Sequence, residues 1–293
     1  MPTDDLVTTD VERAAEVIRS GGLVAIPTET VYGLAADATN ADAVARIFEV
    51  KGRPADHPLI VHLSSVDALA GWAAEVPQPA RTLAESAWPG PLTLIMPRAP
   101  AVLDVVTGGL DTVGVRVPAH PIALELLERS GVALAAPSAN RFGAVSPTTA
   151  QHVANDLGDR LVPGRDVILD GGACPIGVES TIVDCASSPP QILRAGAISV
   201  EEVTRLLAGV VADASGPSRA SGMLASHYAP RCAVRLVDSP DDAVALRAGS
   251  VDSEILDLTD DLVVYAQELY ARLRDADDRG VRTLIAVLPA ASG

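Results

Sequence analysis

Residues 21–34 read GGLVAIPTETVYGL, an apolar run that is followed directly by polar residues. The apolar run Leu23–Ile26 has the length of a strand buried on both faces. Directly after it the chain places Thr28, Glu29 and Thr30, which supply two hydroxyls and a carboxylate. In open α/β sheets, ligands bind in the crevice at the strand ends. The stretch therefore predicts a strand that carries polar side chains to a binding cleft.

The same arrangement recurs at the other predicted strands. Helices and short strands alternate irregularly, so we expect a mixed sheet rather than a regularly wound one. One hydroxyl at a strand end is usually a helix cap or part of a turn. Several of them interleaved with arginine favour a cleft for a small anionic ligand. The polar residues on or beside these strands are His62, Arg116, Ser138, Asn140, Ser180 and Arg194.

Capping residues and hydrophobic periodicity locate the other elements. Thr9 and Glu12 have the spacing of a capping box at the start of a helix. Asn40 is expected to begin a second helix that ends at Gly52, and a third helix is expected over 65–76. Further helices are predicted over 121–129, 148–157 and 199–207, and strands over 23–26, 59–63, 92–96, 113–117, 132–136, 166–169, 180–184 and 191–194.

A stretch without periodicity divides the chain. Residues 209–222, GVVADASGPSRASG, are small and polar and indicate a linker. We therefore expect a catalytic domain over 1–208, a linker over 209–231 and a small α/β domain over 232–293. In the last of these, VRLV, LVVYAQELYARLRDAD and TLIAVL predict a strand, a helix and a strand.

Composition narrows the class of protein. The 293 residues are 48% hydrophobic but only 3% aromatic, so the core must be aliphatic. The formal net charge of −16 opposes strong binding to nucleic acid or to an anionic membrane. The acidic N-terminus is no signal peptide and no apolar run approaches the roughly 20 residues of a membrane span, so we expect a cytoplasmic protein. The three cysteines lack metal-ligand spacing, so no bound structural metal is expected.

Lys51 is the only lysine of the chain and closes the second predicted helix. It is either a cation at a helix C-terminus, worth under about 1 kcal/mol, or part of a phosphate or carboxylate clamp with Arg53, Arg116 and Arg194. The sequence has no P-loop and no dinucleotide-binding glycine pattern. Composition and spacing alone therefore predict only a cleft for a small anionic ligand.

Seven sequence blocks carry a resemblance that goes further. In order they are PTETVYGL, IFEVKGRPADHPLIVHL, WPGPLTLIM, VGVRVPAHP, APSANRFGAVSPT, DGGACPIGVESTIVD and ILRAGAI. Over roughly residues 10–208 the chain resembles the threonylcarbamoyladenylate synthases, the YrdC-like family. The later SGMLASHYAP resembles the segment that joins this domain to a smaller one in the longer members. The resemblance implies a twisted mixed α/β sheet curved around a positively charged cleft.

The resemblance also implies a reaction. Members of the family condense L-threonine, bicarbonate or CO₂, and ATP into threonylcarbamoyl-AMP and pyrophosphate. A transferase complex then moves the threonylcarbamoyl group to adenosine 37 of tRNA. Mg²⁺ is expected to arrive with ATP rather than in a metal site of the protein, and direct tRNA binding is expected to be weak or absent.

The resemblance assigns roles to matching residues. Lys51 and Arg53 are implied to be catalytic, with Lys51 near the phosphates. The threonine site is implied to comprise Thr30, His62, Thr112, Arg116, Ala136 and Ser180. The ATP site is implied to comprise Lys51, Arg53, His57, Ser138, Asn140, Ser146, Arg194 and Tyr228.

The chain departs from the family pattern in three places. His57 stands where the family usually has asparagine, and Leu224-Ala225-Ser226 replaces the usual Lys-Tyr-Arg. The small domain also stops where longer members continue with another helix. We interpret 222–230 as a lid over the cleft with Tyr228 against the nucleotide; a linker merely docked on the surface is the alternative.

Two other functions remain as hypotheses. A carbamoyl-transfer module of hydrogenase maturation has a similar fold, but the zinc-binding cysteine clusters of such proteins are missing from this sequence. A double-stranded RNA or ribosome-binding module is also compatible with a positive concave surface, although the net charge of −16 opposes it.

Overall fold

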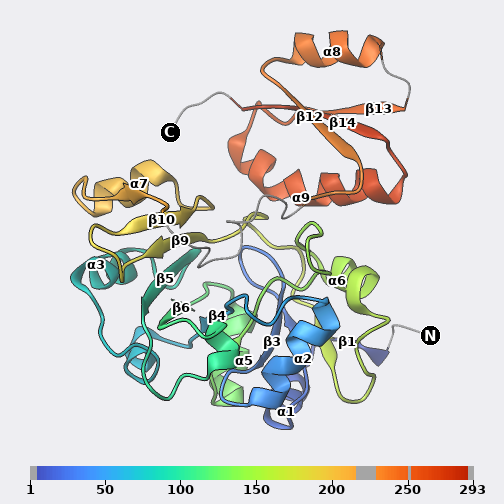
Figure 1. The fold of residues 1–293 in the computed structure, drawn as a ribbon. Coiled ribbons are helices and arrows are strands. Elements are labelled where there is room, and N and C mark those ends of the chain that lie inside the picture. Colours follow the sequence, from blue (N-terminus) through green and yellow to red (C-terminus); the bar gives the residue numbers. More distant parts are fainter. Residues whose placement is uncertain (1–4, 216–228, 250–251, 290–293) are drawn as a thin grey trace.

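The computed structural model describes residues 5–215, 229–249 and 252–289. It shows a large α/β domain with a smaller α/β domain above it in the view of Figure 1. The strands of the large sheet are β1 (Val7–Thr8), β2 (Val24–Ile26), β3 (Gly33–Asp37), β4 (Ile60–His62), β5 (Leu92–Pro97), β6 (Thr112–Arg116), β7 (Leu134–Ala135), β8 (Val167–Leu169), β9 (Thr181–Asp184), β10 (Gln191–Arg194) and β11 (Ala212–Asp213).

These strands form one mixed sheet, as the irregular alternation predicted. Their order across the sheet is β1-β8-β2-β3-β7-β4-β6-β5-β9-β10-β11. The pair β4–β6 is parallel, whereas β2–β3, β4–β7 and β5–β6 are antiparallel. The domain division stays a prediction, and β11 beyond residue 208 still pairs with β10 of the large sheet.

Helices cover the large sheet, and two more pack against the small one. The 3-10 turn Val66–Gly71 lies between β4 and α3. The helices are α1 (Val11–Arg19), α2 (Ala41–Lys51), α3 (Gln78–Ala87), α4 (Asp104–Thr107), α5 (Pro121–Ser130), α6 (Ala150–Leu157), α7 (Val200–Leu206), α8 (Pro240–Ala248) and α9 (Leu262–Asp278).

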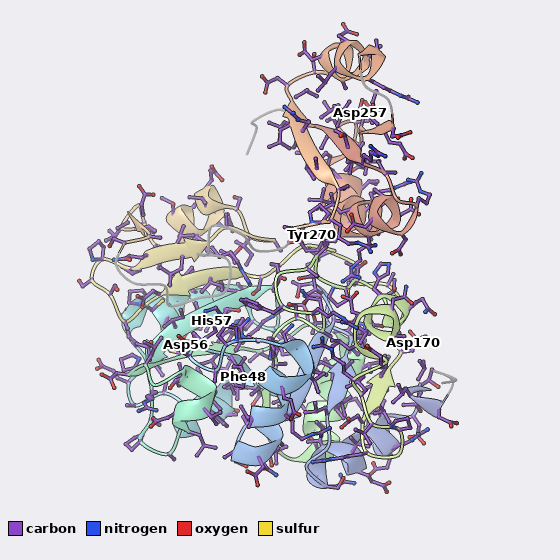
Figure 2. All side chains as sticks on the ribbon, turned by 45° about the vertical axis from the view of Figure 1, so that its right-hand side comes forward. Phe48, Asp56, His57, Asp170, Asp257 and Tyr270 are labelled. Carbon is purple, nitrogen blue, oxygen red and sulfur yellow. The ribbon has the colours of Figure 1, made fainter. Side chains whose placement is uncertain are left out.

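The small sheet contains β12 (Ala233–Val237), β13 (Ser253–Leu256) and β14 (Thr283–Val287). Its order is β12-β14-β13, with both pairs parallel. Helix α9 lies on the side of this sheet that faces the large domain (Figure 1), and Figure 2 shows Tyr270 of α9 at that boundary. The predicted strand, helix and strand are thus present, but α8 and β13 were missed because their patterns are short and weakly periodic.

Side-chain alternation along the strands divides the core into two layers. On β2, Ala25 packs into the main cluster with helices α2, α3 and α6, while its neighbours Val24 and Ile26 pack against α1 and α5 on the other face. This is the period of two that a strand imposes. Aliphatic side chains make up most of both layers, as the composition predicted, and the main cluster also holds Tyr32, Phe48 and Trp88.

Helix boundaries test the capping predictions. Asn40 caps α2 by accepting from the backbone N–H of Ala43, and Gly52 ends it in the left-handed region at φ 65°. The capping box at Thr9 was wrong by one residue, because the carboxylate of Asp10 accepts the N–H groups of Glu12 and Arg13 instead. Carboxylates are strong N-caps.

Two other expectations also needed correction. The helix expected over 65–76 is only the 3-10 turn Val66–Gly71, which has no side-chain cap, and α3 begins after Pro77. The strand expected over 132–136 is shorter and spans Leu134–Ala135. Among the described residues, none of the helices has the length and hydropathy required of a membrane span.

Candidate active site

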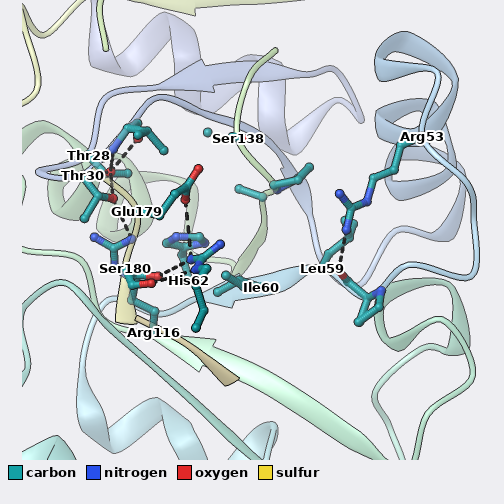
Figure 3. A pocket seen from close by; sticks show the side chains of 16 residues that line it. Thr28, Thr30, Arg53, Leu59, Ile60, His62, Arg116, Ser138, Glu179 and Ser180 are labelled. Atoms are coloured by element: carbon teal, nitrogen blue, oxygen red, sulfur yellow. Dashed lines mark hydrogen bonds and ion pairs between the residues drawn. The ribbon is translucent and has the colours of Figure 1, made fainter. Parts of the chain in front are cut away.

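The predicted strand ends meet at one pocket of about 500 Å³, counting its open mouth. The carboxyl ends of β2, β4, β6 and β10 supply side chains, and so do the turn after β7 and the residues before β9 (Figure 3). The lining residues are Thr28, Thr30, Val31, Gly33, Arg53, Pro58, Leu59, Ile60, His62, Arg116, Ala136, Pro137, Ser138, Glu179, Ser180 and Arg194.

Arg116 forms the first cationic group of the pocket. Its side chain is 4% exposed; Nη1 donates to Thr30 Oγ1 at 2.9 Å and Nε donates to the carbonyl of Gly90 at 3.1 Å. Nη2 lies 2.7 Å from Glu29 Oε1, an ion pair that lacks hydrogen-bond geometry. Nη2 is buried and faces the carboxylate of Glu29, so this carboxylate helps to fix the guanidinium at the pocket. Thr28 holds Thr30 in place through a 2.9 Å contact between their hydroxyls (Figure 3).

His62 lies beside Arg116 because β4 and β6 are parallel and pair these two residues. The imidazole is buried, and its Nδ1 atom has no hydrogen-bond partner among the described residues. Burial, and next the charge of Arg116, lower the pKa of His62 to about 3. His62 is thus neutral at physiological pH. A neutral imidazole can either donate to or accept from a ligand hydroxyl.

Arg194 forms the second cationic group. Its Nη2 donates to Ser180 Oγ at 3.0 Å and lies 3.5 Å from Glu179 Oε2. Ser146 Oγ in turn donates to Glu179 Oε1 at 2.5 Å. Glu179 therefore links a serine behind the pocket to an arginine within it.

Arg53 forms the third cationic group, on the segment after α2. Its Nη2 donates to the carbonyl of Pro58 at 3.1 Å, and its guanidinium lies 5.9 Å from the ring centroid of Phe142. The imidazole of His57 packs against the same ring, with 5.4 Å between the ring centroids, but His57 does not line the pocket. Burial and the charge of Arg53 lower the pKa of His57.

Lys51 lies behind the pocket rather than in it. The side chain is 2% exposed, and Nζ donates to the carbonyls of Ser138 and Asn140, both at 2.5 Å. It thus fixes the backbone of the turn that presents Ser138 to the pocket. Burial, followed by the charge of Arg53, lowers the pKa of Lys51 to about 7.

This shift predicts a pH-dependent stability. Because the folded pKa lies below the unfolded one, the unfolded chain binds more protons above pH 7, and the unfolding free energy should rise with pH. From pH 7 to 9 we expect a gain of up to about 2 kcal/mol that Lys51→Met lacks. Chemical denaturation of both proteins across this range measures the difference. A constant difference would mean that the surrounding oxygens keep Lys51 charged to pH 9.

The structure gathers part of the predicted site at this pocket. The predicted residues that line it are Thr30, Arg53, His62, Arg116, Ala136, Ser138, Ser180 and Arg194. Those outside its lining are Lys51, His57, Thr112, Asn140 and Ser146. Thr112 lies at the opposite end of β6 from Arg116, about 13 Å away at the rise of a strand. Tyr228 and the predicted lid up to that residue lie outside the described residues.

Neither Glu29 nor Glu179 was assigned to the threonine or ATP site, although Glu29 belongs to the polar strand end that was predicted to reach the cleft. Both stand next to predicted ones, in ESTIVD and PTET, and each forms an ion pair with a pocket arginine. Adjacency to Ser180 and Thr30 was therefore an available signal. No sequence pattern could name the arginine that each carboxylate faces, because the pairs join residues 15 and 87 positions apart.

A pocket on a mixed α/β sheet that holds three arginines, hydroxyls and a neutral histidine is typical of a protein that binds small polar anions. Residues 16–196 match the family model of Sua5, YciO and YrdC proteins, described as "Telomere recombination". Residues 198–292 match the model described as "Threonylcarbamoyl-AMP synthase, C-terminal domain". The chain therefore belongs to the Sua5/YciO/YrdC family, as the seven blocks indicated.

Individual relatives agree with this assignment. A threonylcarbamoyl-AMP synthase of Pyrococcus abyssi is 44% identical over 93% of this chain and 87% of its own length. A threonylcarbamoyl-AMP synthase of Bacillus subtilis is 43% identical over 83% of this chain and 71% of its own length. The crystal structure of P. abyssi Sua5 complexed with L-threonine superimposes with a TM-score of 0.87, at 41% identity, over 94% of this chain and 88% of that one.

Proposed function

We propose that the chain is an L-threonylcarbamoyladenylate synthase. It condenses L-threonine, bicarbonate or CO₂, and ATP into threonylcarbamoyl-AMP and pyrophosphate. The proposal is supported by two pairs of side chains in one pocket: Arg116 with the neutral His62, and Arg53 with Arg194. The first pair fits a hydroxylated amino acid, and the second fits phosphate groups. The threonylcarbamoyl-AMP synthases of P. abyssi and B. subtilis described above support this reaction.

The hydrogen-bonding groups around Arg116 and His62 define where threonine binds in the pocket. The substrate carboxylate accepts from the guanidinium of Arg116, which is oriented by Thr30, Glu29 and the carbonyl of Gly90. The substrate hydroxyl pairs with Nδ1 of His62, which has no other partner among the described residues. A buried group that needs a hydroxyl partner rejects an analogue that lacks it.

The nucleotide half uses Arg53 and Arg194 to neutralise phosphate charge. Glu179 is the only carboxylate among the pocket-lining residues, and the described residues contain no cluster of three candidate metal ligands. We therefore assign Mg²⁺ to the phosphates of the incoming ATP rather than to a protein site.

The chemistry then requires mainly positioning. The threonine amine adds to CO₂ and loses a proton, which gives a carbamate. A carbamate oxygen forms a bond to the α-phosphorus while the bond from that phosphorus to the pyrophosphate oxygen breaks. Arginines held in a partly closed pocket stabilise the charge on the phosphates without reorganisation. The carbamate and the mixed anhydride both hydrolyse, so we also propose that a tRNA threonylcarbamoyl-transferase consumes the product promptly.

Pyrophosphate release tests the reaction directly. We expect release only when L-threonine, bicarbonate and ATP are all present, together with an AMP-linked product detected by mass spectrometry. L-Valine, with a methyl group in place of the hydroxyl, should give at least about a hundredfold less product because His62 is left unpaired. Formation of ADP and inorganic phosphate would falsify the assignment. Equal rates with valine would contradict the role of His62.

A further inference from the structure

Helix α9 of the small domain places one largely covered arginine against the large domain. The side chain of Arg274 is 11% exposed. Its Nη1 and Nη2 donate to the two carboxylate oxygens of Asp156 on α6, at 3.1 and 2.6 Å. Nε donates to the carbonyl of Ser146 at 3.1 Å, and Nη2 also reaches the carbonyl of Val145. One guanidinium thus joins a helix and two consecutive loop carbonyls of the large domain.

Apolar contacts hold the same loop. Val145 is buried in the core cluster of the small domain, together with Leu273 and Ala276 of α9 and Leu284 of β14. Val145 therefore belongs to the large domain by sequence and to the small domain by packing. Removing it from water couples the loop to α9 independently of the arginine.

The other side of this loop contacts Glu179, which lines the pocket. Ser146 Oγ donates to Glu179 Oε1 at 2.5 Å, and Glu179 lies 3.5 Å from Arg194. Helix α9 also holds the segment that leads to Glu179, because Gln267 Nε2 donates to the carbonyl of Pro175 at 3.0 Å. A side chain at Gly177 would meet the carbonyl oxygen of Gln267 at 2.4 Å. Both segments behind the nucleotide half are thus fixed by one helix.

We propose that Arg274 is a positioning residue: from the small domain it sets the place of Ser146 and Glu179, and through them the nucleotide half of the pocket. The proposal rests on the proposed function. Without the guanidinium, the carboxylate of Asp156 loses its cation and two loop carbonyls lose a donor. The loop then relaxes, and a shift of about 1 Å at a reacting site can cost about a hundredfold in rate.

Arg274→Met tests this role, because methionine keeps an apolar stem but removes every donor. We expect the KM for ATP to rise roughly tenfold or more, while the KM for threonine, bound at Arg116, stays within about threefold. Arg274→Lys should recover part of the loss, since it restores one charge. The matched control is Arg272→Met on the same helix. Arg272 is 52% exposed, and its one ion-pair partner among the described residues is Glu268, one turn away, so both constants should stay unchanged.

Hydrogen exchange provides a readout that does not depend on activity. Amides of residues 143–148 should exchange faster in Arg274→Met than in Arg272→Met, while those of β4 and β6 should stay protected. If the wild type makes no adenylate but the exchange result holds, the proposed function fails and the positioning contact stands. Unchanged exchange in 143–148, or an equal rise of both KM values, overturns the proposal. Should Arg274→Met not fold, Asp156→Asn weakens the same contact and is judged by the same outcomes.

Discussion

Arg116→Ala is expected to abolish threonine-dependent pyrophosphate release and also to destabilise the fold. In the proposed function the guanidinium donates to the substrate carboxylate, and in the structure it is the cation paired with the buried carboxylate of Glu29. Breaking a buried ion pair by removing one partner costs about 3–5 kcal/mol, because the remaining charge is uncompensated. Denaturant unfolding measures the second effect, and the pyrophosphate assay measures the first.

A double variant separates the two effects. Arg116→Met with Glu29→Met removes both charges, and apolar replacement of a buried pair is often close to neutral. This protein should recover most of the lost stability but still fail to bind threonine, as measured by calorimetry. Arg129→Ala serves as the control, since Arg129 and its partners Glu12 and Glu125 are all about half exposed and each pair should contribute under about 1 kcal/mol. Threonine binding by the double variant would refute the role of Arg116.

The sequence predicted the strands around the site better than the contacts within it. The polar ends of β2, β4, β6 and β10 were predicted because a buried apolar run followed by hydroxyls or arginine is a local pattern. Their convergence followed from a general rule for α/β sheets. The alignment of His62 with Arg116 needed the parallel pairing of β4 and β6, for which the sequence has no signal.

Lys51 shows why the contacts within the site could not be predicted from the sequence. Its place on the inward face of α2 was predicted from the helical period, and burial confirms it. Its partners are backbone carbonyls 87 and 89 positions away, and any residue type can supply a carbonyl. Val145 is a second case, because its packing partners lie in the other domain. Strand β3 was missed for a different reason, since its Ala-rich sequence has weak strand propensity.

Removal of the small domain is expected to leave the large domain folded but nearly inactive. The main core clusters of the large domain contain no residue beyond Val211, so truncation does not open them. The cut is best placed after Ser215, because β11 (Ala212–Asp213) still pairs with β10. Truncation exposes Val145 and removes both α9 contacts to the segments carrying Ser146 and Glu179. Adenylate synthesis should therefore fall by roughly a hundredfold or more.

Threonine binding and the point variants identify the cause of this loss of adenylate synthesis. Affinity for threonine should stay within about threefold of the intact chain, because Arg116, Thr30 and His62 depend on strands of the large sheet. If Arg274→Met alone reproduces most of the loss, the contact of α9 accounts for the effect of the small domain. If the loss is reproduced by Tyr228→Ala in the intact chain instead, the predicted lid accounts for it. Full activity after truncation would leave the small domain as an accessory and would contradict both roles.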